Sequence, residues 1–207
     1  AMIDGFNHGE DVHTITASQV FGVPVEEVTP LMRRSAKAVN FGIVYGISAF
    51  SLSQDIGVTV AQAKEYMEKY FQHYSGVRAY MDHVVEQARQ DGYVTTLFGR
   101  RRWVPELKSS NFNTRSFGER VALNAPIQGA AADIIKIAML RVRNRLRADD
   151  LTGRLVLQVH DELIVECPAA EAEAVCRLVK EEMESAAALS VPLVAETHAG
   201  KSWGEAH

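Results

Sequence analysis

The residue pattern changes at Gly153, and this change limits the possible folds more than any other feature of the sequence. Before it, most of the chain has a helical pattern. After it, residues 155–159 and 163–165 are rich in β-branched and apolar side chains, and polar residues 160–162 separate them. This pattern predicts a β-hairpin with a polar tip. Helices first and a small antiparallel sheet last indicate an α+β fold in two lobes.

Capping and breaking residues mark the expected helices. Thr29 is a suitable N-cap, and Pro30 a suitable first residue, for a helix that runs to about Gly46. Further helices are expected over residues 13–21, 60–74, 77–91, 113–147 and 169–189. Pro126 is expected to kink or break the long helix that contains it. Strands are expected over residues 93–98 and 191–197.

The charge is unevenly distributed along the chain. The net charge is −4, yet residues 28–147 carry 18 Lys and Arg against 9 Asp and Glu. The two flanks together carry 4 against 17. A basic middle between acidic flanks suits a protein that binds a polyanion with one surface. A solvated helical surface can also be basic, so charge alone leaves the partner open.

The sequence argues against a membrane protein and against a zinc site. No apolar run approaches the roughly 20 residues that span a bilayer. Residues 1–5 show no basic segment followed by an apolar one, so no signal peptide is expected. Cys167 and Cys176 have no neighbouring Cys or His at zinc-ligand spacing. We therefore expect two reduced thiols in a cytoplasmic protein with no membrane partner.

A four-residue spacing links two cations and two aromatic residues: Arg33, Lys37, Phe41 and Tyr45. Each step of four advances about 400° around a helix, so the stripe stays on one side. Cations can meet a triphosphate, and a flat ring further along can meet a sugar and a base. An amphipathic helix with Arg and Lys stems lying over an aromatic core has the same spacing, and both interpretations stay open here.

The whole segment 33–46, RRSAKAVNFGIVYG, resembles motif B of the family A DNA polymerases, the bacterial DNA polymerase I type. The resemblance implies that Arg33 and Lys37 hold the triphosphate of the incoming dNTP. It also implies that Phe41 lies against the sugar, and that Tyr45 and Gly46 lie near the templating base. His13 matches a family position that also contacts the phosphates. Because family members with Phe at this position discriminate against dideoxynucleotides, Phe41→Tyr is expected to relax that discrimination in a complete enzyme.

A second polar series lies on the long expected helix, at Arg120, Asn124 and Gln128. Side-chain amides can donate to the minor-groove acceptors that every base pair shows, which suits an enzyme that checks geometry without reading sequence. Helix capping and interhelical hydrogen bonding are the alternative roles for such residues. Residues 119–129 resemble the family segment that contacts the primer–template, which implies DNA contacts for all three. Residues 97–102 resemble another family segment. We interpret the role of its three arginines as partly electrostatic and partly structural.

The expected hairpin tip, Val-His-Asp-Glu at residues 159–162, resembles motif C of the same family. The resemblance implies that Asp161 binds Mg²⁺, that His160 lies near the primer end, and that Glu162 has a secondary role. Asp161, Lys37 and Glu162 are thus the expected catalytic residues. The same resemblance assigns residues 1–118 to a fingers subdomain and residues 119–207 to the C-terminal part of the palm.

The expected chemistry needs a second aspartate. Two metal ions roughly 4 Å apart stabilise the attacking and leaving oxygens of nucleotidyl transfer. The family supplies that aspartate from motif A, with a Ser-Gln-x-Glu element, and residues 1–29 contain nothing similar. The chain is therefore expected to lack motif A and the thumb, and to need the remainder of the polymerase as a partner.

These features lead to a main hypothesis and two alternatives. The main one is a C-terminal fragment of a DNA polymerase that binds dNTP and primer–template but is inactive alone. The first alternative is a non-catalytic binding module, either a natural split subunit or an engineered fingers fragment. The second is a single-subunit RNA polymerase, which the Phe41 pattern and the segment containing Asn124 and Gln128 fit less well.

Overall fold

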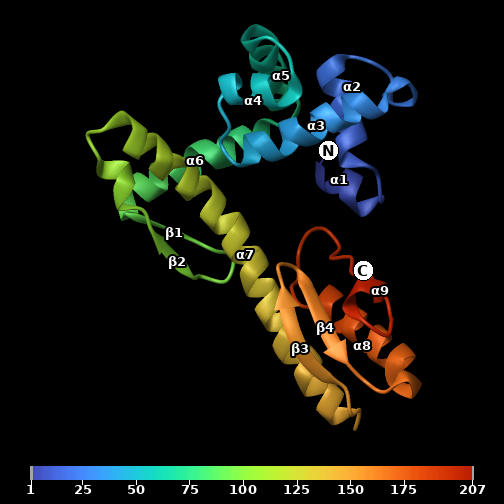
Figure 1. Cartoon of the computed structure of the whole chain (residues 1–207). Helices are drawn as coiled ribbons and strands as arrows, with labels where there is room; N and C mark the ends of the chain where they lie inside the picture. The colour runs from blue at the N-terminus through green and yellow to red at the C-terminus, as the bar shows by residue number, and fades with distance from the viewer. Residues whose placement is uncertain (1, 207) are drawn as a thin grey trace. The chain divides into compact units, whose positions relative to one another are not determined.

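The computed structural model describes residues 2–206, and it is an α+β structure with two small antiparallel sheets (Figure 1). The fold class predicted from the sequence is confirmed. The chain forms two compact units, one ending at Gln128 and the other beginning at Gly129. The division into subdomains at residues 118 and 119 stays a prediction, since it concerns function rather than compactness.

The first unit is mainly helical. Its helices are α1 (Met2–Asn7), α2 (Val12–Phe21), η1 (Val25–Glu27), α3 (Pro30–Val44), α4 (Ala49–Ile56), α5 (Val60–His73), α6 (Ser75–Asp91) and η2 (Pro105–Lys108). The caps of α3 and α5 are those expected: the Thr29 hydroxyl accepts from the Met32 amide, and Thr59 forms a capping box with Gln62. Gly92 ends α6 with a φ of 80°.

A short hairpin in the first unit replaces the strand expected over residues 93–98. β1 (Tyr93–Thr95) pairs antiparallel with β2 (Arg101–Trp103), and Tyr93 lies opposite Trp103. The predicted strand was too long because Thr96 begins the turn: its hydroxyl accepts hydrogen bonds from the amides of Phe98 and Arg100. The second strand lies in the arginine run, which sequence analysis did not recognise as a strand.

The core of the first unit lies beneath α3. Val39 and Ile43 of this helix pack with Leu52 of α4 and with Tyr70 and Tyr74 at the end of α5. All five are at most 6% exposed. This packing fixes which side of α3 faces solvent, because the opposite side carries the residues at the other helical positions.

The long helix α7 (Phe112–Ala148) runs without a break through Pro126. Proline lacks the amide that would donate to residue 122, but Pro126 is buried, and packing can compensate for one lost hydrogen bond. Of the two outcomes expected at Pro126, a kink or a break, the break was therefore wrong, and the kink stays a prediction. The residues of α7 up to Gln128 belong to the first unit, and the later residues belong to the second.

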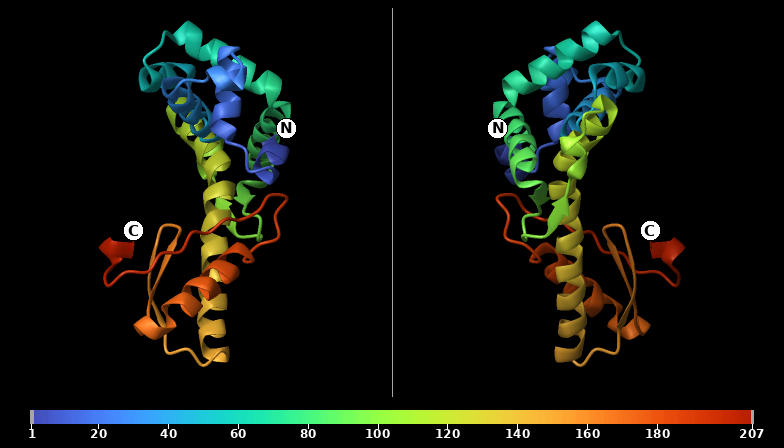
Figure 2. Two further views of the ribbon diagram at one scale, coloured as in Figure 1. Left: turned by 90° about the vertical axis from the view of Figure 1, so that its right-hand side faces the viewer. Right: turned by 90° about the vertical axis from the view of Figure 1, so that its left-hand side faces the viewer.

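The second unit contains the end of α7, the hairpin β3 (Arg154–Val159) and β4 (Glu162–Glu166), η3 (Ala169–Glu171), α8 (Ala172–Glu184) and α9 (Trp203–Ala206). Figure 2 shows α8 lying across the later turns of α7. Val142 and Leu146 of α7 pack there against Val175, Leu178 and Val179 of α8, and side chains of β4 join them. The predicted hairpin is confirmed, with Val159 opposite Glu162.

Two predictions for the C-terminal region were wrong. α8 ends at Glu184 rather than near residue 189, and an Arg141 guanidinium donates to the Ser185 carbonyl beyond its end. Residues 191–197 form no strand within the described structure, because no neighbouring strand pairs with them. The Ala195 amide instead donates to the Glu184 carboxylate, at 3.0 Å.

Across residues 2–206, none of the helices combines the length and the apolar character that crossing a membrane requires.

Candidate functional site

The helix α3 presents two chemically different faces. Ala36, Val39 and Ile43 are fully buried on one side. The four-residue stripe is exposed on the other side: Arg33, Lys37, Phe41 and Tyr45. Phe41 and Tyr45 are 47% and 37% exposed. Because its rings are not part of the core, the stripe differs from an amphipathic helix that covers an aromatic core.

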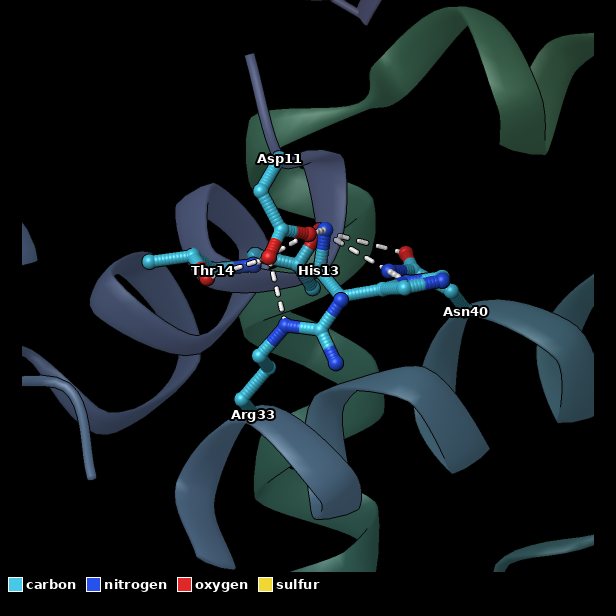
Figure 3. A network of polar contacts seen from close by, with 6 residues as sticks. Asp11, His13, Thr14, Arg33 and Asn40 are labelled. Carbon is cyan, nitrogen blue, oxygen red and sulfur yellow. Dashed lines mark hydrogen bonds and ion pairs between the residues drawn. The ribbon is translucent and has the colours of Figure 1, made fainter. Parts of the chain in front are cut away.

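The N-terminus of α2 lies beside the start of the stripe (Figure 3). Asp11 is the N-cap of α2, and its Oδ1 accepts from the amides of His13 and Thr14, at 3.0 and 3.4 Å. Its Oδ2 accepts from Nε of Arg33, at 2.5 Å, and from the Thr14 hydroxyl, at 2.8 Å. One carboxylate thus caps α2 and orients the guanidinium of Arg33 from α3.

His13 is held from behind by buried polar side chains. Asn40, which is 8% exposed on α3, places its Nδ2 3.0 Å from Nδ1 of His13. Thr16 lies within hydrogen-bonding distance of the Asn40 amide, and its hydroxyl lies 3.4 Å from that of Tyr74. The chain of contacts therefore runs from the core of the unit to the ring of His13.

The remaining members of the stripe follow His13 along α3. The rings of His13 and Phe41 have centroids 5.8 Å apart, and those of Phe41 and Tyr45 are stacked at 6.3 Å. The ammonium of Lys37 lies 6.0 Å from the centre of the Phe41 ring. We call these five residues the α2–α3 site: His13, Arg33, Lys37, Phe41 and Tyr45.

Neighbouring charges and burial shift the pKa values of several groups at this site. The hydrogen bond from Arg33 is the main reason why the pKa of Asp11 falls to about 2, and the same contact raises the pKa of Arg33. Burial lowers the pKa of His13 most; nearby Arg33 and Lys37 lower it further, and Asp11 opposes them. The site therefore combines two cations with a neutral imidazole, which suits binding of an anion.

Gly46 ends the stripe beside α7 of the same unit. It adopts a φ of 74°, which favours glycine, and a Cβ there would lie 3.1 Å from Leu123 and 3.3 Å from Arg120. Arg120 and Gln128 are exposed on α7. The Oδ1 of Asn124 is buried and accepts no hydrogen bond from the described residues. A buried acceptor without a partner is costly, and no described residue compensates for this one.

The hairpin tip consists of His160 and Asp161 in the turn, with Glu162 as the first residue of β4. His160 has a φ of 52°, an uncommon conformation for a residue other than glycine. The Gln158 amide donates to its carbonyl, at 2.7 Å. The Asp161 side chain is exposed and has no hydrogen-bond or ion-pair partner within residues 2–206.

The hairpin tip does not amount to a complete site for two metal ions. Among residues 2–206, no three His, Cys, Asp or Glu side chains lie close enough together to hold a metal ion. Mg²⁺ is commonly bound by one or two carboxylates together with water and substrate phosphates. Asp161 therefore fits one ligand of such an ion, whereas the bridging pair of carboxylates is not formed by the described residues.

The structure brings together in one unit the residues predicted for nucleotide binding, and it places the residues of the hairpin tip in the other unit. Sequence analysis missed Asp11 and Asn40 as members of the network around His13. Asp11 could have been found as the N-cap of the helix that contains His13. Asn40 could have been found as a polar residue among the apolar positions of α3.

Comparison with known proteins shows which family this chain resembles. The sequence profile of DNA polymerase family A matches residues 1–205. DNA polymerase I of Geobacillus stearothermophilus is 55% identical over 205 residues, and DNA polymerase I of Bacillus subtilis is 54% identical over 205 residues. In both comparisons the match covers 99% of this chain and 23% of the relative. The chain thus spans about a quarter of the length of these relatives.

A solved structure is similar over the same extent. It is the POL domain of Pol1 from M. smegmatis in complex with DNA primer–template and dNTP. The TM-score is 0.93 at 49% sequence identity, and the match covers 99% of this chain and 36% of that one.

Proposed function

Because the chain belongs to DNA polymerase family A, we propose that it binds an incoming dNTP and a primer–template for transfer of a nucleotidyl group to the primer 3′-hydroxyl. The observation that carries this proposal is the α2–α3 site. It combines two cations, a neutral imidazole and two exposed aromatic rings on neighbouring helices. A nucleoside triphosphate has the matching chemistry, with an anionic end and flat or apolar groups beyond it.

In this proposal the α2–α3 site holds the nucleotide from phosphate to sugar. Arg33 and Lys37 contact the triphosphate, and His13 contributes a further hydrogen bond. Asp11 already occupies Nε of Arg33, which leaves the terminal nitrogens of the guanidinium for phosphate oxygens. Phe41 lies against the sugar, and Tyr45 and Gly46 lie near the templating base.

Three residues of α7 are proposed to contact the primer–template: Arg120, Asn124 and Gln128. Arg120 is exposed next to Gly46, so the two proposed DNA contacts adjoin within the first unit. The M. smegmatis relative is a complex with DNA primer–template and dNTP, which supports both classes of ligand.

The hairpin tip is proposed to contribute a metal-binding carboxylate, Asp161, with Glu162 secondary and His160 near the primer end. Family A DNA polymerases generally use divalent metal ions, and Mg²⁺ would supply charge stabilisation to the reacting phosphate. Asp161 can provide one oxygen ligand, and the remainder of the polymerase is proposed to provide the second aspartate. We therefore expect the chain to bind a nucleotide without joining it to a primer.

Nucleotide binding is tested by titrating a dNTP with Mg²⁺ into the chain and following heat or fluorescence. Lys37→Ala is expected to weaken binding roughly tenfold or more, since a hydrogen bond to a charged group contributes about 1.5–3 kcal/mol. Arg34→Ala is the matched control, because Arg34 is an exposed cation of the same helix outside the stripe. Equal affinity of the unaltered chain and the Lys37→Ala variant would contradict the proposed function.

A non-catalytic nucleotide-binding subunit is the second candidate, and it is equally compatible with the incomplete metal site among the described residues. Both candidates predict dNTP binding. Mixing the chain with the missing part of a family A polymerase separates them. Restored primer extension supports the polymerase fragment, and persistent binding without extension supports the binding subunit.

Phe41 provides a test of nucleotide choice in a complete enzyme that carries this segment. Phe41→Tyr is expected to increase termination by dideoxynucleotides relative to extension by dNTPs. The ratio is measured on a sequencing gel at fixed concentrations of both nucleotides. Equal termination by the two forms would remove Phe41 from the proposed sugar contact.

A further inference from the structure

A buried amide lies behind the ring of His13 (Figure 3). Nδ2 of Asn40 is 3.0 Å from Nδ1 of His13, and Asn40 is 8% exposed. An amide nitrogen donates hydrogen bonds and cannot accept them, so Nδ1 of His13 is the acceptor. In a neutral imidazole the proton then resides on the other nitrogen, Nε2.

The Thr16 hydroxyl contacts both polar atoms of the Asn40 amide, and the Tyr74 hydroxyl contacts Thr16. The Thr16 hydroxyl lies 3.1 Å from Nδ2 and 3.2 Å from Oδ1 of Asn40. Thr16 and Tyr74 are 0% and 6% exposed, and buried polar contacts of this kind hold side chains in place. A hydroxyl can donate or accept, so Thr16 fixes where the amide lies but not which end faces His13.

The charges that face His13, together with burial, determine whether its ring is charged. Arg33 and Lys37 of α3 disfavour an imidazolium, and Asp11 at the start of α2 favours it. The net effect, with burial, is a lowered pKa for His13, so the ring is neutral near physiological pH. If the amide oxygen faced a neutral His13, Nε2 would present a lone pair, which repels phosphate oxygens. With the amide nitrogen in that place, Nε2 presents a proton.

We propose that Asn40 is a positioning residue for the nucleotide: its amide donates to Nδ1 of His13 and so makes Nε2–H the donor to the triphosphate. The proposal rests on the proposed function, because it requires a dNTP at the α2–α3 site. Asn40 itself contacts no nucleotide. It gives the site an oriented neutral donor beside Arg33 and Lys37 without adding a third positive charge.

The protonated nitrogen can be identified by ¹⁵N NMR of labelled histidine in the chain at about pH 7.5. Seven histidines contribute signals, and His13→Gln identifies those of His13. We expect unprotonated Nδ1 and protonated Nε2. Asn40→Leu, which has a similar size but no hydrogen-bonding group, is expected to give a mixture of tautomers. Asn40→Asp, whose carboxylate only accepts, is expected to protonate Nδ1 and raise the pKa of His13.

Nucleotide affinity is measured for the same variants by titration with dTTP and Mg²⁺. Asn40→Leu is expected to weaken binding roughly tenfold, the effect of one hydrogen bond to a charged group. Asn40→Asp is expected to make binding pH-dependent: Nε2 carries a proton below the raised pKa of His13 and loses it above, so affinity falls as the pH rises. A purely structural role of Asn40 would not produce this dependence.

Tyr70→Phe is the matched control for changes to this buried polar region. The Tyr70 hydroxyl is buried in the same core, next to Tyr74, and has no hydrogen-bond partner among the described residues. Its removal is expected to leave both the tautomer of His13 and the dTTP affinity unchanged. Thermal unfolding of every variant shows whether a loss of affinity reflects a loss of fold.

Three results would overturn the proposal. Protonated Nδ1 with bare Nε2 in the unaltered chain would show that the amide faces the other way. An unchanged tautomer or unchanged affinity in a folded Asn40→Leu variant would remove Asn40 from the mechanism. The expected tautomer with no dTTP binding, or with binding that Lys37→Ala does not weaken, would contradict the proposed function and the role of the tautomer with it.

Discussion

The α2–α3 site and the hairpin tip differ in how their polar side chains are supported. At the α2–α3 site, Asp11 caps α2 and orients Arg33, and Asn40 lies behind His13. Each of these contacts lies within the first unit. At the hairpin tip, the Asp161 carboxylate has no hydrogen-bond or ion-pair partner among residues 2–206. One site is arranged before a ligand arrives, whereas the other presents a single exposed carboxylate.

Under the proposed function, the chain would contribute more to nucleotide binding than to metal binding. Binding an anion needs cations and donors in fixed positions, and the contacts between α2 and α3 provide them. Stabilising a reacting phosphate with two metal ions needs several carboxylates, and the hairpin tip supplies one with its neighbour.

Primer extension is expected to be absent when the chain is incubated alone with primer–template, dNTPs and Mg²⁺. The reason is that Asp161 cannot by itself hold the pair of ions that the reaction uses. Products are separated on a denaturing gel, with a complete family A polymerase as the positive control. Extension by the chain, abolished by Asp161→Asn, would show that the hairpin tip suffices for catalysis without a second aspartate from elsewhere.

Loss of the Asp11 carboxylate is expected to destabilise the first unit. Asp11→Ala removes the N-cap of α2 and should lower the free energy of unfolding by about 1 kcal/mol. Asp11→Asn is the matched variant, since Asn caps helices about as well as Asp. This variant should lower the free energy of unfolding less than Asp11→Ala does. Urea denaturation measures both. Equal losses in the two variants would show that the cap contributes little.

The ion pair between Asp11 and Arg33 is expected to affect stability in acid. The pKa of Asp11 is about 2 in the folded chain and about 3.9 in an unfolded chain. The lower pKa in the folded chain means that the ionised Asp11 carboxylate stabilises the fold. This stabilisation is present above about pH 4 and is lost as the pH falls toward 2. Urea midpoints measured across this range should fall less steeply for Asp11→Asn than for the unaltered chain. Arg33→Gln should reduce the slope similarly, and an unchanged slope in both variants would contradict the assignment.

The turn at the hairpin tip is expected to cost a small amount of stability. A residue other than glycine at positive φ costs about 1–2 kcal/mol, and the entropy of glycine offsets about half of this. His160→Gly should therefore raise the free energy of unfolding by roughly 0.5 kcal/mol. Asp150→Gly is the matched control, since Asp150 has a φ of 53° elsewhere in the same unit. A loss of stability in His160→Gly alone would show that the imidazole supports the hairpin.

Local signals in the sequence predicted several elements because short-range interactions form them. Thr29 and Pro30 mark the start of α3, and Gly92 marks the end of α6, through contacts within a few residues. α4 was missed, although Ser48 and Gly57 cap it, because a helix of eight residues shows little periodicity. The strand expected over residues 191–197 was wrong because a strand also requires a partner, which its own residues do not specify.

The four-residue stripe on α3 could be predicted without the structure, since helical geometry alone places residues four apart on one side. The tertiary structure decided which side faces solvent, because Val39 and Ile43 pack into the core opposite the stripe. It also decided how the cation and the imidazole are held. Asp11 and Arg33 are 22 residues apart and His13 and Asn40 are 27 apart, so these contacts exist only because α2 packs against α3.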